Sequence, residues 1–204
     1  MGLRSGLMEV PLIYDLFQNG LTRKVNQNWF VNSVVRPTHG QRILDIGCGT
    51  ATVLTKLDDV TYLGIDHNAE YINKARARFS DKGSFHCIDI NDATFKDYGR
   101  FDIVLLLGVL HHLRDDEVNA LMQAIPGVLN PDGVVITFDC AIVSGQHPIA
   151  RLLAKLDRGR YARSPQQYRD LLESHFEIET EIVRHDLLKV PYTHAIFRAK
   201  PRAS

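Results

Sequence analysis

From Gln41 onward, short apolar runs alternate with segments of helical periodicity, and this alternation restricts the fold more than any other feature. The apolar runs predict strands at 42–46, 60–65, 84–88, 101–107 and 134–138. The intervening segments predict helices at 52–57, 69–79 and 117–129, and 130–133 reads as a turn. Strands that alternate with helices predict an α/β fold with a doubly wound, mostly parallel sheet.

The C-terminal part of the chain follows a different pattern. A helix is predicted at 166–174, and two alternating strands at 177–184 and 194–199 are expected to form an antiparallel hairpin at the edge of the sheet. The sheet would then have seven strands. We expect a single domain over 1–204, divided into an N-terminal helical cap (1–38, with helical stretches at 12–18 and 21–35), a cofactor-binding core (41–140), an acceptor-side insertion (141–163) and a C-terminal helix with hairpin (164–204).

Composition excludes several classes of protein. The chain has 204 residues, 45% of them hydrophobic, which argues against wholesale disorder. Lys and Arg together number 24, as do Asp and Glu, and a neutral chain is a poor match for a nucleic-acid duplex. No apolar run approaches the length of about 20 residues that spans a membrane. Cys48, Cys87 and Cys140 are too few and too far apart for a disulfide framework or a zinc site, so we expect no metal and a reducing cytoplasm.

The first strand runs directly into a glycine-rich segment, Gly47-Cys48-Gly49-Thr50. Ligands of doubly wound sheets bind beyond the carboxyl ends of the strands. Gly47 and Gly49 would let the backbone approach such a ligand closely, although an ordinary tight turn is the alternative. Thr52 stands where a dinucleotide-binding fingerprint has its third glycine, which counts against a dinucleotide.

Three carboxylates lie near this segment in the predicted fold. Asp66 ends the second strand, where it could accept from both hydroxyls of a ribose, and Asp89 ends the third, where it could accept from an adenine amino group. Asp45 could anchor an ammonium group. Acids without a lysine in the loop suit a cationic adenosyl ligand better than a polyphosphate. A helix N-cap role for Asp66 and a polar turn at Asp89 remain alternatives.

Five segments in order resemble the motifs of class I S-adenosylmethionine-dependent methyltransferases. They are ILDIGCGTATVL, YLGIDHNAEYINKAR, FHCIDIND, FDIVLLLGVLHHL and LNPDGVVITF, and they cover roughly half of the chain, from Gln41 to Phe138. The N-terminal YDLFQNGLTRKVNQNWF faintly resembles the ubiquinone/menaquinone-biosynthesis branch. The resemblance implies a Rossmann-like methyltransferase fold, S-adenosyl-L-methionine as cofactor and S-adenosyl-L-homocysteine as product.

The resemblance also implies which residues contact the cofactor. The methionine portion would lie against Asp45, Gly47, Gly49 and Thr50. The ribose and adenine would lie against Asp66, His67, Asp89 and the backbone of Ile90. The sulfonium would lie beside the backbone of Leu107, and Tyr14 could close over the cofactor or simply pack in the core.

An oxygen or nitrogen acceptor also needs to lose a proton, and His112 or His111 after the fourth strand could take it. Because this family often builds acceptor specificity after the fifth strand, we expect the insertion to contact the acceptor. An apolar helical stripe is predicted there at Ile149, Leu152, Leu153 and Leu156. Segment 151–170 has six basic and two acidic residues, and acceptor contacts are expected at Arg158, Arg160 and Tyr161. The basic segment has three interpretations: it forms a pocket for an anionic acceptor, it is a solvated lid, or it contacts anionic lipid.

The leading hypothesis is a methyltransferase for a small molecule, anionic or lipid-like. An RNA or protein methyltransferase is the first alternative, but the neutral charge and LLLGVLHHL in place of an Asn/Asp-Pro-Pro-Tyr signature argue against it. A non-catalytic protein of the same fold that binds the cofactor is the second.

Overall fold

The computed structural model describes residues 28–90, 94–156 and 161–202. The predictions for Tyr14, Arg158 and Arg160, and those for helical stretches before residue 28, lie outside the described residues.

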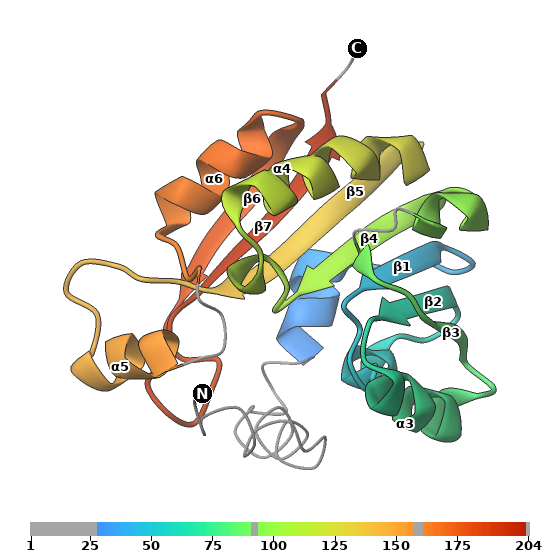
Figure 1. The fold of residues 1–204 in the computed structure, drawn as a ribbon, viewed down its shortest axis with the longest axis horizontal. Coiled ribbons are helices and arrows are strands. Elements are labelled where there is room, and N and C mark those ends of the chain that lie inside the picture. The colour runs from blue at the N-terminus through green and yellow to red at the C-terminus, as the bar shows by residue number, and fades with distance from the viewer. Residues whose placement is uncertain (1–27, 91–93, 157–160, 203–204) are drawn as a thin grey trace, which may run out of the picture.

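Seven strands form one mixed sheet in the order β3-β2-β1-β4-β5-β7-β6 (Figure 1). Strands β1 to β5 are parallel, and β7 is antiparallel to both β5 and β6. Their bounds are β1 Arg42–Ile46, β2 Thr61–Asp66, β3 Gly83–Cys87, β4 Phe101–Leu107, β5 Leu129–Cys140, β6 Phe176–Arg184 and β7 His194–Pro201. The prediction of a doubly wound sheet closed by a C-terminal hairpin is confirmed.

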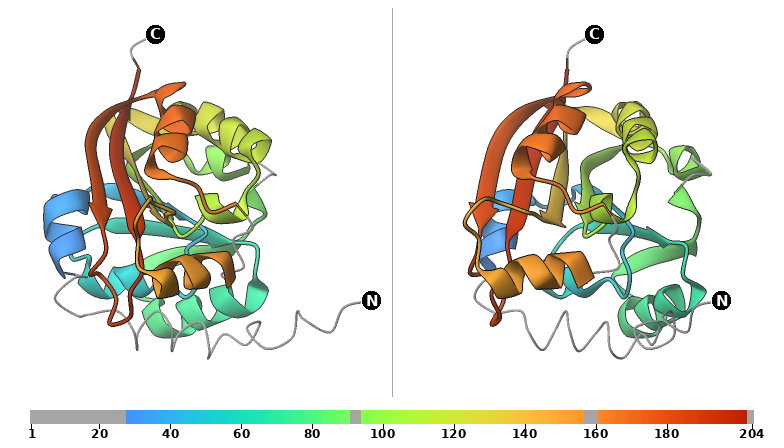
Figure 2. Two further views of the ribbon diagram at one scale, coloured as in Figure 1. Left: turned by 90° about the vertical axis from the view of Figure 1, so that its left-hand side faces the viewer. Right: turned by 60° about the vertical axis from the view of Figure 1, so that its left-hand side comes forward.

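Helices cover both faces of the sheet, as Figure 2 shows. The described helices are α3 Ala69–Phe79, α4 Asp115–Ala124, α5 Pro148–Leu156 and α6 Pro165–Glu173. On one face, Val118 and Met122 of α4 and Tyr168 of α6 pack into the core. On the other, α3 and the helical segment 28–35 contribute to a second core cluster, and Val31–Val35 of that segment is π-helical.

Three predicted segments differ from the structure, and a proline explains one of the differences. The helix expected at 117–129 stops at Ala124 and continues as the 3₁₀ turn Ile125–Val128, since Pro126 has no N–H to extend the α-helical ladder. The segment expected at 52–57 is a short 3₁₀ helix, Thr52–Lys56. The turn expected at 130–133 lies within β5, where the pairing register with β4 is irregular between Phe101 and Ile103.

Helix α5 is amphipathic as predicted, but two of the large apolar residues of the predicted stripe do not face the protein. Ala150 and Ala154 are buried, whereas Ile149 is 49% and Leu152 is 55% exposed. Small residues on the inner side let α5 approach the body of the protein closely, and Ile149 and Leu152 are left toward solvent. None of the described helices is long and apolar enough to cross a membrane.

The topology places the candidate site. Because β1 to β5 run parallel, their carboxyl ends meet at one edge of the sheet. Strand β1 lies between β2 and β4, so the chain winds away from β1 in both directions. This reversal of strand order opens the crevice in which doubly wound sheets bind ligands.

Candidate cofactor site

The glycine turn after β1 is fixed to the end of β2. Gly47 and Gly49 have φ of 74° and 53°, in the left-handed region that favours glycine. The N–H groups of Gly47 and Cys48 both donate to the carbonyl of Ile65, at 2.8 and 3.0 Å. A Cβ on Gly47 would lie 2.6 Å from Cγ2 of Val109, so the turn also packs against the segment after β4. Three strand ends therefore hold the turn in place.

Asp66 connects this turn to the start of α3. Its side chain is buried, its Oδ2 accepts from Gly49 N–H at 2.9 Å, and its Oδ1 accepts from Asn68 N–H at 2.8 Å. The helix cap itself is Asn68, whose Oδ1 accepts from the N–H groups of Glu70 and Tyr71. The N-cap alternative for Asp66 is therefore wrong. Each carboxylate oxygen has further lone-pair capacity for a ligand.

Asp45 is the most unusual acid of the site. It is 1% exposed, and its Oδ2 accepts from the hydroxyl of Tyr62 at 2.5 Å. Its Oδ1 is buried and has no hydrogen-bond partner in the described part of the chain. Burial raises the pKa of Asp45 to about 7, against the hydrogen bond from Tyr62 that lowers it, and the charge of Asp66 raises it further. A buried acceptor atom left unpaired in a native fold calls for an explanation, and a ligand's donor would provide one.

The remaining predicted cofactor residues lie along the same edge. Thr50 is buried. His67 is exposed, with Nδ1 3.6 Å from Asp66 Oδ1. Strand β3 ends at Cys87, so Asp89 does not end that strand as predicted, and its side chain is exposed. The N–H of Ile88 donates to the carbonyl of Asp66 at 3.0 Å, which brings the segment of Asp89 and Ile90 beside Asp66. Leu107 is the last residue of β4.

The two histidines after β4 differ sharply in surroundings. His111 is buried, and its Nδ1 lies 2.7 Å from Oδ1 of Asp139, which also accepts the His111 backbone N–H at 3.1 Å. His112 is exposed and stacks on His111 with ring centroids 4.1 Å apart. Asp139 is buried near the end of β5. The sequence analysis missed Asp139, although an acid directly after a predicted buried strand was the signal that identified Asp66.

Arg163 holds the end of the insertion against the histidine segment. Its buried guanidinium donates to the carbonyls of Leu110 and Leu113 at 2.8 and 2.7 Å, and to Asp115 Oδ1 at 2.6 Å. The backbone N–H of Tyr161 donates to the carbonyl of His111 at 3.1 Å. Arg163 is therefore a positioning residue for the loop that carries the histidines.

The basic segment 151–170 is less available than its composition suggested. Arg163 pairs with Asp115, and Arg169 forms ion pairs with Glu173 and Glu181. Tyr161 of this segment is 37% exposed and lines a pocket of about 310 Å³ together with Asp115 and Arg163. These two arginines are held by the fold, and an acceptor contact at Tyr161 stays a prediction.

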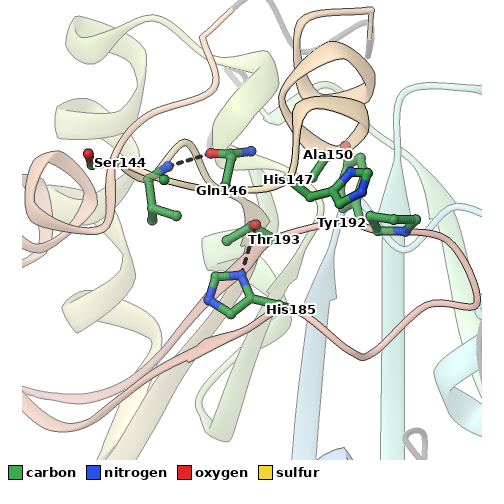
Figure 3. Close-up of a pocket in the computed structure, with 10 residues that line it drawn as sticks. Ser144, Gln146, His147, Ala150, His185, Tyr192 and Thr193 are labelled. Atoms are coloured by element: carbon green, nitrogen blue, oxygen red, sulfur yellow. Dashed lines mark hydrogen bonds between the residues drawn. The ribbon is translucent and has the colours of Figure 1, made fainter.

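A second pocket, of about 240 Å³, lies beyond the end of β5 (Figure 3). Gln146 and His147, before α5, line one side, and His185 and Thr193, between β6 and β7, line the other. Gln146 Oε1 accepts the Val143 N–H at 2.5 Å, and His147 Nδ1 accepts the Ile149 N–H at 3.2 Å. No Asp or Glu among the described residues lines this pocket. It therefore offers hydrogen-bond donors without acidic repulsion.

The described residues hold no cluster of side chains of the kind that binds a metal ion. Across 28–90, 94–156 and 161–202, no group of three or more His, Cys, Asp or Glu side chains could hold a metal ion. Cys48, Cys87 and Cys140 form no disulfide with one another.

A mixed sheet with five parallel strands, and with a glycine turn beside buried acids at its switch point, is the architecture of a Rossmann-like domain. A family model described as a methyltransferase domain matches residues 43–133. The ubiquinone biosynthesis O-methyltransferase of Bradyrhizobium sp. (strain ORS 278) is 30% identical over 167 residues, which cover 74% of this chain and 61% of that protein. The enzyme of the same description from Rhodopseudomonas palustris (strain TIE-1) is also 30% identical, over 62% of this chain and 49% of its own length.

Solved structures agree on the fold. The N-methyltransferase NodS from Bradyrhizobium japonicum WM9, in complex with S-adenosyl-L-homocysteine, superposes with a TM-score of 0.67 at 14% identity, over 89% of this chain and 87% of that one. Residues 43–133 therefore match a methyltransferase domain, and the described chain shares the fold of a solved methyltransferase that binds S-adenosyl-L-homocysteine. The chain spans only part of the two curated relatives, 61% of the length of one and 49% of the other.

The first prediction concerns the stability cost of Asp45. Because its pKa rises to about 7 in the folded protein, it favours folding below the unfolded value of about 4 and loses that contribution as pH rises toward 7. Asp45→Asn removes this pH-dependent contribution, because the amide does not titrate. The free energy of unfolding of the variant minus that of wild type should therefore increase between pH 4 and 8, by on the order of 4 kcal/mol. Urea titrations at several pH values measure it, and a difference independent of pH would contradict the assignment.

The second prediction concerns Arg163. A lysine ammonium is a point charge and cannot reach the carbonyls of Leu110 and Leu113 together with Asp115. Arg163→Lys should therefore lower the free energy of unfolding by about 2–4 kcal/mol. Arg151→Lys on the exposed side of α5 is the matched control, expected within about 0.5 kcal/mol of wild type. Equal stabilities of the two variants in urea would show that Arg163 does not anchor the loop.

Proposed function

We propose that this protein transfers a methyl group from S-adenosyl-L-methionine to a hydroxyl group of a small molecule. The observation that carries the proposal is the glycine turn with two buried acids, Asp45 and Asp66, one of which has a buried oxygen without a partner. When bound, the cofactor supplies a methyl group already activated by its cationic sulfur. The protein's own contribution is then to bind, align and remove a proton.

Four sets of residues would hold the cofactor. Asp66 Oδ1 and Oδ2 would accept from the ribose hydroxyls, a role supported by the N–H groups of Asn68 and Gly49 that fix the carboxylate. Asp45 Oδ1 suits an ammonium group because it is a buried acceptor. The left-handed Gly47 and Gly49 allow backbone contact with the methionine portion. Thr50, His67, Asp89, Ile90 and Leu107 complete the proposed surface.

His111 is the base that the geometry favours. Asp139 accepts from Nδ1, which selects the tautomer whose lone pair is on Nε2 and stabilises the imidazolium formed when a proton arrives. His112 is exposed, and its ring lies against that of His111. The sequence analysis put His112 first, and we now place His111 first because a buried acid orients it.

The acceptor is proposed to carry an anionic group. The pocket of about 240 Å³ beyond β5 is lined by His147, His185 and Gln146 and, among the described residues, by no acid. The two curated relatives are named as O-methyltransferases, which supports a hydroxyl acceptor. A lipid-like acceptor has separate support in the exposed Ile149 and Leu152 of α5, which could rest on a membrane surface. The three cysteines, which form no disulfide with one another, support a cytoplasmic location.

The third prediction separates ligand binding from helix capping. Asp66→Ala should weaken binding of S-adenosyl-L-homocysteine by roughly 10- to 150-fold, since bonds to a charged group are worth about 1.5–3 kcal/mol. Asn68→Ala removes the cap of α3 and should cost about 1 kcal/mol of stability with little change in affinity. Titration calorimetry measures the affinities. Unchanged affinity in Asp66→Ala would remove the ribose contact from the proposal.

The fourth prediction tests the base. With 3,4-dihydroxybenzoate as probe acceptor, His111→Gln and Asp139→Asn should lower kcat by about 10²–10⁴ and leave the cofactor Kd nearly unchanged. His39→Gln, exposed before β1 at the opposite edge of the sheet, is the control. Full turnover by both variants would exclude His111 as the base. Cofactor binding by wild type without turnover of hydroxylated acceptors would favour the non-catalytic alternative.

A further inference from the structure

Asp45 and Tyr62 form a buried pair that the methyl-transfer chemistry does not itself require. The two side chains are 1% and 2% exposed, and the phenol donates to Asp45 Oδ2 at 2.5 Å. No ion pair in the described part of the chain involves Asp45, and its other oxygen is buried without a partner. An ionised carboxylate in such a place is costly unless a cation joins it.

Among the residues that the structure describes, the groups around Asp45 add no positive charge. In the sheet its register partners are Gly64 of β2 and Leu105 of β4, neither of which titrates. Asp66 at the end of β2 adds repulsion. The thiol of Cys48 in the glycine turn has its pKa raised by burial and by both acids, so it stays neutral. The same burial raises the pKa of Tyr62, which remains a hydrogen-bond donor.

We propose that Asp45 and Tyr62 form a proton-releasing ammonium subsite, in which the free protein holds a proton on Asp45 and gives it up when the cofactor binds. The inference rests on the proposed function. The neutral carboxyl loses its proton to solvent, and the carboxylate that remains accepts from the incoming ammonium group. One proton leaves and one ion pair forms, so the charge buried in the site stays balanced.

Tyr62 is the positioning residue of this subsite. Its hydroxyl occupies Oδ2 and stabilises the ionised form, which turns Oδ1 into the atom available to the ligand. The raised pKa of Asp45, to about 7, agrees with a proton that is present near neutrality and easily displaced. Because the side chain of Tyr62 is buried, it would act on the cofactor only through Asp45.

The first experiment counts protons. S-adenosyl-L-homocysteine is titrated into the full chain at pH 6 in two buffers of different ionisation enthalpy, and the dependence of the binding enthalpy on the buffer gives the number of protons released. We expect about one for wild type and none for Asp45→Asn. His39→Gln, which removes an exposed imidazole before β1 and away from the site, should still release the proton. Release that persists in Asp45→Asn or disappears in His39→Gln would overturn the proposal.

The second experiment isolates Tyr62 by the pH dependence of affinity. For wild type, Kd should rise up to about tenfold per pH unit as pH falls below 7, because the protonated carboxyl cannot pair with the ammonium group. Tyr62→Phe should move the midpoint of this dependence upward by about one to two pH units. Tyr168→Phe is the matched control, since its buried hydroxyl donates to the Cys140 carbonyl on the other face of the sheet. It should leave the midpoint unchanged.

The outcomes separate this inference from the proposed function. An equal loss of affinity at every pH in Tyr62→Phe would mean a merely structural role and would overturn the subsite. Wild-type binding that is independent of pH between 5.5 and about 7.5, without proton release, would overturn it as well while leaving the proposed function intact. Absence of binding by wild type at every pH would instead sink the proposed function.

Discussion

The carbonyl of Ile65 and the carboxylate of Asp66, adjacent at the end of β2, hold the site together. The first accepts from two N–H groups of the glycine turn, and the second accepts from Gly49 and from the start of α3. The turn would otherwise be a flexible connection with glycines in the left-handed region. Fixed in this way, it presents backbone and carboxylates in one geometry before any ligand arrives, which reduces the ordering cost of binding.

The site sacrifices stability for this arrangement. Asp45 is buried with one oxygen unpaired, and burial keeps its pKa near 7. A neutral side chain at that position would suit the free fold better, but it could not pair with a cation. Local destabilisation of this kind is the usual signature of a functional site.

The sequence was sufficient for the architecture because each strand and helix carried its own periodic pattern. The strands at Arg42–Ile46 and Phe101–Leu107, and the helix at Ala69–Phe79, have the predicted bounds. Asp66 could be placed because it directly ends a strand. Periodicity cannot report a missing backbone donor inside a helix, so the effect of Pro126 on the helix after Asp115 was overlooked.

Tertiary pairing explains what the sequence left out of the candidate site. Arg163 looked like part of a basic surface, but Asp115 and two carbonyls distant in sequence bury it. The link between His111 and Asp139 joins residues 28 positions apart, and that between Asp45 and Tyr62 joins residues 17 apart. Ile149 and Leu152 of α5 face solvent because the side of the helix with Ala150 and Ala154 packs against the protein.

The most direct test of the account is a crystal structure of the protein with S-adenosyl-L-homocysteine. We expect the ribose hydroxyls on the carboxylate of Asp66 and the ammonium group within about 2.7–2.9 Å of Asp45 Oδ1, as charge-assisted hydrogen bonds require. Bound ligand elsewhere than the glycine turn, or an Asp45 Oδ1 still without a partner in the complex, would contradict it.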